Sequence, residues 1–247
     1  MDAPLLINER IDDLGRRGYR IIQNRTRFCF GVDAVLLSWF ADVRKGERVV
    51  DLCSGTGIVP LLMDARYGAG DYTGLEILPD MADMANRSAM LNDVETHVRF
   101  IRGDVKDAAE LLGKGQFQAV TVNPPYMPAG SGLRNPDREM AIARHEILCT
   151  LEDVVRAAKS LLETGGRFYM VHRPGRLPEI LSVMEAYRIA PERAVFVHPF
   201  ADKDAAMVLI SGISGGRNRM RTEAPLILYE APGKYTEQVL KIYREDG

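Results

Sequence analysis

The segment 49–62, VVDLCSGTGIVPLL, places an acidic side chain next to closely spaced glycines. Its pattern predicts an apolar strand that ends near Asp51, a loop with Gly55 and Gly57, and then a helix. Glycines let backbone N–H groups approach a ligand, and a helix N-terminus favours negative charge. The dinucleotide spacing G-x-G-x-x-G fails, because Pro60 stands three residues after Gly57. Since Asp51 would repel a pyrophosphate, the segment favours a ligand with a cationic amine.

Two more acidic residues follow the next two predicted strands. Glu76 closes the second strand, about 20 residues past the glycine loop, where an acid accepts hydrogen bonds from ribose hydroxyls. Asp104 follows the third strand in the turn RGDV. Any one of these acids alone reads as a solvated loop residue or a helix cap. Three acids at successive strand ends instead predict a ligand site along one edge of a sheet.

A second motif, Asn-Pro-Pro-Tyr, follows the fourth predicted strand directly. It comprises Asn123, Pro124, Pro125 and Tyr126. Two prolines remove backbone donors and fix φ, so the turn is stiff. We expect this turn to hold the Asn123 side chain and the Tyr126 ring in set directions at the same sheet edge.

The elements that must position these residues alternate along the chain. Apolar runs predict strands at 48–52, 71–76, 98–102, 118–122 and 167–171. Helical patterns occupy 32–40, 58–66, 79–91, 151–162 and 177–187, and Asp33 could be the N-cap of the first. This rhythm predicts an α/β, doubly wound, mostly parallel sheet with helices on both faces. Further strands at 194–197, 206–213 and 226–229 predict an antiparallel C-terminal strand or hairpin.

Length and composition fit one ordinary globular domain. The chain has 247 residues, with 46% hydrophobic and 27% charged residues. We expect a single domain over 1–247, in which an N-terminal segment (1–45) precedes the ligand-binding core (46–200) and a β-rich finish (201–247). The formal net charge of −2 excludes a globally basic nucleic-acid binder but leaves room for a local basic patch.

Cysteine usage and hydropathy suggest the compartment. Cys29, Cys53 and Cys149 are odd in number, widely spaced and form no CxxC pair. This predicts a reducing environment, with no disulfide framework and no metal site. The N-terminus lacks the features of a signal peptide, and no apolar run is long enough to span a membrane. We therefore expect a cytoplasmic protein without membrane association.

Taken together, these motifs resemble the class I S-adenosylmethionine-dependent methyltransferases of the NPPY amino-methylating group. The likeness is strongest to bacterial tRNA adenine-N6 methyltransferases that act on valine tRNA, and it covers nearly the whole chain. Flanking segments share it: FCFGVDAVLLSWF at 28–40, AIARHE at 141–146, and the finish from 196 onward. The resemblance implies a Rossmann-like, seven-stranded sheet. It also implies methyl transfer from S-adenosylmethionine to the exocyclic N6 amine of an adenine in RNA, with tRNA the expected partner.

The resemblance also implies roles for individual residues. The methionine part of the cofactor would be held by Asp51, Cys53, Gly55 and Gly57. Its ribose would be bound by Glu76, with Ile77 beside it, and its adenine by Asp104 and the backbone amide of Val105. Asn123 and Asp33 are further candidates for cofactor contact. His145 would order the loop after the NPPY motif, and Cys53 would be a packing residue rather than a nucleophile.

The NPPY motif suits the chemistry of an aromatic amine. Such an amine is a poor nucleophile, because its lone pair is delocalised into the ring. The Asn123 side-chain oxygen and the Pro124 carbonyl can accept its two N–H protons, which favours a pyramidal nitrogen. Tyr126 can stack on the base once it leaves its stack. No metal or covalent nucleophile is required, because the methyl donor implied by the resemblance is a sulfonium. Positioning and electrostatics would make the main contributions to catalysis.

Three arginine clusters are candidates for contact with RNA phosphates. The first comprises Arg16, Arg17, Arg20, Arg25 and Arg27; the second comprises Arg217, Arg219 and Arg221; the third, after the NPPY motif, comprises Arg134, Arg138 and Arg144. Each cluster could equally be an ordinary solvated face. Their presence on a net-acidic chain suggests a local phosphate-binding surface.

Three alternative functions stay open. A methyltransferase acting on a protein glutamine amide uses the same NPPY chemistry, but only about 45 residues precede the first core strand, too few for a separate recognition domain. A DNA adenine-N6 methyltransferase would need a larger insert for reading sequence. A catalytically silent cofactor-binding subunit is disfavoured by the intact NPPY motif and glycine loop.

Overall fold

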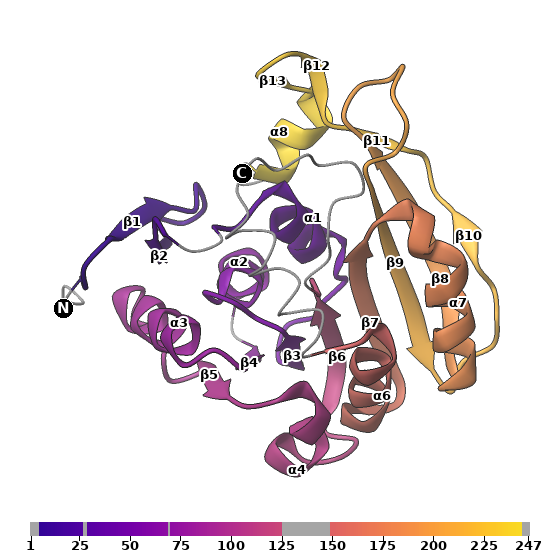
Figure 1. The fold of residues 1–247 in the computed structure, drawn as a ribbon, viewed down its shortest axis with the longest axis horizontal. Helices are drawn as coiled ribbons and strands as arrows, with labels where there is room; N and C mark the ends of the chain where they lie inside the picture. Colours follow the sequence, from indigo (N-terminus) through magenta and orange to yellow (C-terminus); the bar gives the residue numbers. More distant parts are fainter. Residues whose placement is uncertain (1–4, 27–28, 69, 125–148, 244–247) are drawn as a thin grey trace.

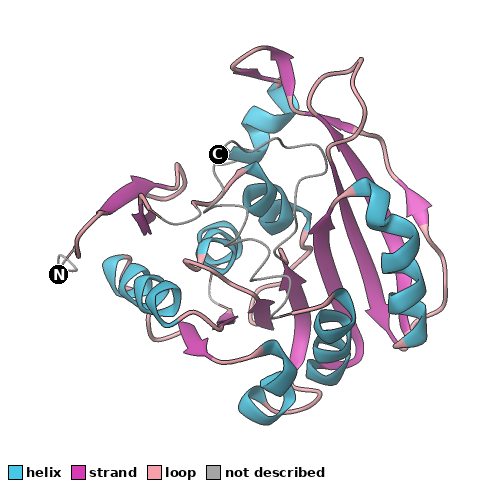
Figure 2. Ribbon diagram, viewed as in Figure 1, coloured by secondary structure: helices cyan, strands magenta, loops and turns pink. Residues whose placement is uncertain are grey.

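The computed structural model describes residues 5–26, 29–68, 70–124 and 149–243. The predicted site residues that lie outside the described residues are therefore Arg27, Pro125, Tyr126, Arg134, Arg138, Arg144 and His145. The described part forms three layers, in which helices cover both faces of a central sheet (Figure 1, Figure 2).

Seven long strands make up the body of the sheet. In chain order they are β3 (Arg48–Leu52), β4 (Asp71–Glu76), β5 (Val98–Arg102), β6 (Phe117–Val122), β7 (Leu162–His172), β8 (Ile189–His198) and β9 (Met207–Ser214). Their spatial order is β5-β4-β3-β6-β7-β9-β8, and β9 runs antiparallel to both of its neighbours. The other six strands are parallel. The predicted doubly wound, mostly parallel sheet with an antiparallel C-terminal strand is confirmed.

Side chains alternate between the two faces of each strand, as a sheet buried on both sides requires. Val49 and Ala119 face one core cluster, whereas Val50 and Val120 face the other. The first cluster receives α1 (Val32–Phe40), α2 (Ile58–Tyr67), α3 (Pro79–Leu91) and α8 (Glu237–Tyr243). The second receives α4 (Ala108–Leu112), α6 (Leu151–Leu161) and α7 (Leu177–Ala186). Short turns of 3₁₀-helix, η1 (Val105–Asp107) and η2 (Pro174–Arg176), precede α4 and α7.

Local sequence signals explain where several helices begin. Thr150 caps α6 in a capping box: its hydroxyl accepts from the Asp153 N–H at 3.1 Å, and the Asp153 carboxylate accepts from the Thr150 N–H at 3.1 Å. α3 begins with Pro79, whose missing N–H costs nothing in the first turn. At α1 the prediction of Asp33 as N-cap is wrong. Gly31 is the N-cap, and Asp33 lies in the first turn.

The N-terminal segment contains a hairpin that the sequence did not predict. β1 (Glu9–Asp13) and β2 (Arg20–Asn24) pair antiparallel beside α3. The Ile22 N–H donates to the Ser88 hydroxyl at 2.9 Å, and Arg87 pairs with Glu9 at 2.6 Å. The charged sequence of β1 hides its strand character, which comes from pairing and from contact with α3.

The C-terminal finish also differs from the prediction. The expected strand at 226–229 is divided: β11 (Leu226–Ile227) joins β8 in parallel, as does β10 (Arg221–Thr222). β12 (Tyr229–Ala231) and β13 (Lys234–Tyr235) form a separate hairpin that leads into α8. The segment is nevertheless part of the main core, because Leu226, Val239 and Ile242 are buried in the first cluster.

Candidate active site at the carboxyl edge of the sheet

The central strand β3 brings the predicted site residues together. Leu52 of β3 pairs with Leu75 of β4 on one side and with Val122 of β6 on the other. Glu76 and Asn123 follow these two partners directly, so both lie beside the glycine loop that leaves β3. Asp51 and Asn123 are 72 positions apart in the sequence. The parallel strands bring both residues to one edge of the sheet.

Glu76 is buried and held by backbone donors. Its Oε2 accepts a hydrogen bond from the Gly55 N–H at 2.8 Å, and its Oε1 accepts one from the Leu78 N–H at 3.0 Å. Within the described ranges no cation forms an ion pair with it. The two donors fix the plane of the carboxylate, while each oxygen keeps a free lone pair. Glu76 can therefore accept from two neighbouring hydroxyls, and the half-buried Ile77 follows it directly.

The two glycines of the loop have different reasons to be glycine. Both have positive φ, 56° at Gly55 and 85° at Gly57. A Cβ on Gly57 would lie 2.4 Å from the Phe100 ring, so packing of α2 against β5 requires this residue. A Cβ on Gly55 would meet no described atom within 4 Å. Gly55 is therefore the position where a ligand can approach the backbone, and Gly57 shapes the start of α2.

Asp51 is a buried acid without a cationic partner among the described residues. It is 2% exposed, and its Oδ1 accepts from the Thr121 hydroxyl at 2.6 Å. Burial raises the pKa of Asp51 to about 7; the Thr121 hydrogen bond opposes this rise, and the charge of Glu76 adds to it. A cation placed beside Asp51 would favour the ionised form, as the prediction of an amine-bearing ligand requires.

Cys53 adopts a left-handed conformation, with φ of 57°, within the loop. The nearby Cys149 thiol and burial both raise the pKa of the Cys53 thiol well above its ordinary value. A thiol that stays protonated is a poor nucleophile. This argues against Cys53 as a nucleophile, and its role as a packing residue stays a prediction.

Asp104 caps the turn η1 after β5. Its Oδ1 accepts from the Lys106 N–H at 2.9 Å, and its Oδ2 lies 3.5 Å from the Lys106 ammonium. Val105 is buried as the first residue of η1, where a backbone N–H has no partner within the turn. Asp104 and Val105 are adjacent at the start of this turn, and their contact with an adenine stays a prediction.

Asn123 and Pro124 end β6 at the same edge. The Asn123 amide nitrogen donates to the Asp33 carboxylate at 3.0 Å, which links the NPPY motif to the first turn of α1. The sequence pointed to both residues but gave no sign of their contact. Pro124 is buried, and the rest of the motif lies outside the described residues.

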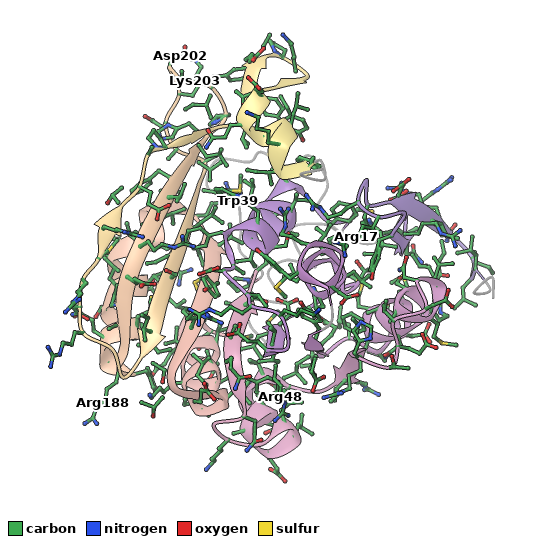
Figure 3. All side chains as sticks on the ribbon, turned by 180° about the vertical axis from the view of Figure 1, so that it is seen from behind. Arg17, Trp39, Arg48, Arg188, Asp202 and Lys203 are labelled. Atoms are coloured by element: carbon green, nitrogen blue, oxygen red, sulfur yellow. The ribbon has the colours of Figure 1, made fainter. Side chains whose placement is uncertain are left out.

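The structure separates the arginines that were predicted to bind RNA. For Arg16 the prediction is wrong. This residue is 7% exposed, and its guanidinium donates a hydrogen bond to the Ile242 carbonyl at 3.3 Å. Buried in this way, it ties the N-terminal segment to α8 and offers no surface to phosphate. Arg17 is exposed in the β1–β2 turn (Figure 3).

The remaining arginines lie at two ends of the molecule. Arg20 begins β2 next to Asn92, which follows the C-terminal end of α3. Arg25, past the other end of β2, is exposed toward the carboxyl edge, because β2 and α3 run in opposite directions. Arg217 and Arg219 follow Gly215, whose N–H donates to the carbonyl of Arg188 just before β8. They lie at the amino edge, where Figure 3 places Arg188, and Arg221 pairs in register with Arg193.

No group of three or more potential metal ligands occurs within the part of the chain that the structure describes. In the same residues no helix is both long and apolar enough to cross a membrane.

Comparison with known proteins gives concordant matches. The family model "Methyltransferase small domain" matches residues 31–188. A curated relative from Porphyromonas gingivalis, named tRNA1(Val) (adenine(37)-N6)-methyltransferase, is 27% identical over 220 residues, which cover 86% of each chain. A relative of the same name from Aeromonas salmonicida is 26% identical and covers 91% of this chain and 92% of its own.

Solved structures share the fold. A predicted O-methyltransferase, protein Atu636 from Agrobacterium tumefaciens, superposes with a TM-score of 0.70 at 26% identity, covering 85% of this chain and 95% of its own. TYW2 of P. horikoshii, in complex with MeSAdo, has a TM-score of 0.59 at 15% identity and covers 85% and 72% of the two chains. The sheet order, the acids at its carboxyl edge and the family match agree: the chain belongs to the methyltransferase small domain family and has the class I methyltransferase fold.

Proposed function

We propose that the protein transfers a methyl group from S-adenosylmethionine to the N6 amine of an adenine in RNA, with tRNA as the substrate. The observation that carries this proposal is the position of Asn123 at the end of β6, beside the strand whose end bears Asp51 and the glycine loop. An amide acceptor and a cofactor-type loop at adjacent strand ends provide for a nucleophilic amine and its methyl donor at one place.

The residues at this edge fit S-adenosylmethionine group by group. Asp51, buried without a cation among the described residues, suits the positively charged methionine part. Gly55 leaves space for a ligand where a Cβ would stand, and Glu76 keeps lone pairs for the ribose hydroxyls. Asp104 and Val105 would hold the adenine.

The bound cofactor supplies an electrophilic methyl group on its sulfonium, so this chain needs no covalent nucleophile. The Asn123 and Pro124 carbonyl oxygens would accept hydrogen bonds from the two N–H groups of the target amine, and Tyr126 would stack on the base. The extra proton on the methylated nitrogen would leave to water. The carbonyl oxygens of Asn123 and Pro124 would stabilise the positive charge that develops on the amine nitrogen. This interaction strengthens toward the transition state.

The names of the curated relatives support RNA as the substrate, and the two relatives described above share most of their length with this chain. A tRNA substrate also implies action in the cytoplasm. The exposed Arg25 near the carboxyl edge is suited to a phosphate beside the target base.

The test is incubation of the purified protein with labelled S-adenosylmethionine and total RNA from cells that lack it, followed by nucleoside mass spectrometry. We expect N6-methyladenosine in the tRNA fraction. Parallel reactions with adenine-containing DNA and with glutamine-containing protein extracts distinguish the alternative substrates.

Two outcomes would contradict the proposal. Methylation of DNA or of a protein amide, without methylation of RNA, would move the activity to another substrate class. Cofactor binding by calorimetry with no methylation of any of the three would point to a silent subunit.

A further inference from the structure

A contact outside the NPPY motif fixes the side chain of its asparagine. The Asn123 Nδ2 donates to Asp33 Oδ2 at 3.0 Å, although the two residues are 90 positions apart. An ionised carboxylate only accepts hydrogen bonds, so the amide must turn its nitrogen toward Asp33. Because Oδ1 and Nδ2 lie on opposite sides of the same planar group, this contact also sets the direction of Oδ1.

Asp33 is itself held in place by the start of α1. Its Oδ1 accepts from the Ala34 N–H at 3.0 Å, one of the donors that lack a partner within the helix. A Cβ at position 31 would lie 2.8 Å from this oxygen, so Gly31 provides room for the carboxylate. Ala34 and Val35 bury the same turn in the core. Asp33 thus joins a rigid helix to the NPPY motif.

We propose that Asp33 is a positioning residue that orients the Asn123 amide, with its nitrogen toward α1 and its oxygen free to accept from the target amine. This inference rests on the proposed function, in which Asn123 Oδ1 is the acceptor. Without Asp33, the amide could rotate and present its NH₂ group, a donor, to a substrate that also donates. The cofactor contact that the resemblance implied for Asp33 stays a prediction, and the contact with Asn123 is the one that the structure contains.

The geometry also explains why a carboxylate is needed at this position. Both oxygens of Asp33 accept a hydrogen bond, one from Ala34 and one from Asn123. An asparagine of the same shape could accept only at its single oxygen, and its NH₂ group would face a donor at the other site. Asp33→Asn should therefore misorient Asn123 about as effectively as Asp33→Ala.

A double-mutant cycle measures whether Asp33 acts through Asn123. Single-turnover methyl transfer with saturating cofactor and RNA is compared for wild type, Asp33→Ala, Asn123→Ala and the double variant. We expect Asp33→Ala to slow transfer about tenfold to a hundredfold in the wild-type background, the effect of losing a charge-assisted orienting contact. In the Asn123→Ala background the same change should alter the rate by less than about threefold. The cofactor Kd and the RNA Kd should stay within about twofold of wild type.

An acid that follows the same helix provides the matched control. Asp42 is exposed just past the far end of α1, and Asp42→Asn should leave the transfer rate unchanged. Asp33→Asn is the second test variant and guards against a folding defect in Asp33→Ala. Asp33→Asn should slow methyl transfer by about the same factor as Asp33→Ala, and its Tm should equal that of wild type.

The inference would be overturned if the rate losses of the two single variants multiply in the double variant. It would also be overturned if the cofactor Kd of Asp33→Ala is tenfold higher than that of wild type. The first would mean that Asp33 acts independently of Asn123, and the second that it binds the cofactor directly. These outcomes leave the proposed function intact, whereas a fully active Asn123→Ala would contradict the proposed function itself.

A readout without substrate keeps the inference testable if the RNA substrate is wrong. In ¹⁵N-correlated NMR spectra of the full chain, the side-chain NH₂ protons of Asn123, assigned by their loss in Asn123→Ala, should shift and exchange faster with water in Asp33→Ala. An unchanged Asn123 NH₂ signal would show that Asp33 does not hold the amide.

Discussion

The carboxyl and amino ends of the parallel strands both carry buried or half-buried charged side chains, but the partners of those charges differ. At the carboxyl edge, Asp51 and Glu76 accept from a hydroxyl and from backbone N–H groups. At the amino edge, acids pair with arginines: Glu47 with Arg167, and Asp71 with Arg99 at 3.0 Å. Figure 3 shows Arg48, beside Asp71, at this second end of the sheet.

This difference separates Asp51 and Glu76, at the binding edge, from the acids of the supporting edge. Asp104 is the exception at the carboxyl edge, because the Lys106 ammonium lies 3.5 Å from it. An ion pair neutralises its own charge and leaves little for a ligand. Neutral donors hold a carboxylate in place but leave its negative charge and some of its lone pairs available. The raised pKa of Asp51 is the cost of this arrangement in the free protein. The carboxyl edge is therefore suited to a cationic ligand, and the following predictions compare matched changes at the two edges.

The largest effect is expected at Asn123. Asn123→Ala should slow single-turnover methyl transfer on the order of 10²–10³-fold, the usual loss when one preorganised polar group at a reacting centre is removed. Cofactor affinity should change little, since the contact is to the substrate base. Gln118→Ala is the control, because this amide lies at the amino end of the same strand and bonds to Arg48 and Glu163. A rate for Asn123→Ala within about threefold of wild type would show that the NPPY mechanism is wrong here.

The next effect concerns cofactor binding. Glu76→Ala should weaken S-adenosylmethionine about tenfold to a hundredfold, because a charge-assisted contact to hydroxyls contributes about 1.5–3 kcal/mol. Isothermal titration calorimetry measures this change. Glu47→Ala removes an acid that is already paired with Arg167, so its cofactor affinity should equal that of wild type. Equal affinities for the two variants would remove the distinction between the edges.

The raised pKa of Asp51 predicts that cofactor affinity depends on pH. The free protein has an Asp51 pKa of about 7, so the carboxylate fraction rises between pH 6 and pH 8. A cationic ligand prefers the carboxylate, and affinity through Asp51 should therefore rise with pH. The ratio of wild-type to Asp51→Asn affinity should increase about tenfold over this range, since the ligand's own titration cancels in the ratio.

Asp71→Asn at the amino end of β4 is the control for this pH series, because Asp71 already pairs with Arg99. Its affinity should follow wild type at every pH. A wild-type to Asp51→Asn ratio that stays flat from pH 6 to pH 8 would mean that Asp51 does not face the bound cation.

The smallest effect is expected for RNA affinity. Arg25→Ser, near the carboxyl edge, should weaken tRNA binding severalfold and lower the slope of log affinity against log salt by about one. The double variant Arg217→Ser/Arg219→Ser, at the amino edge, should leave both quantities unchanged. Filter binding at several salt concentrations tests both, and a reversed order would place the RNA at the amino edge.

The sequence alone determined the features that depend on local pattern. Alternating apolar runs and helical periods identified five of the seven long strands to within one residue at each end, and β7 and β8 in part. The acids and Asn123 stand at strand ends, and parallel strands bring such ends to one edge by topology alone. These residues could therefore be assigned to one site without any knowledge of side-chain contacts.

Only the tertiary structure decided how those residues are held and which neighbours are available. Arg16 lies in a basic run that suggests an exposed surface, yet the Ile242 carbonyl and the core bury it. Gly55 and Gly57 look alike in sequence, but only Gly57 is required by the Phe100 ring. The contact between Asp33 and Asn123 joins residues 90 positions apart. Local periodicity carries no information about such contacts, because they depend on how α1 and β6 pack in the same core.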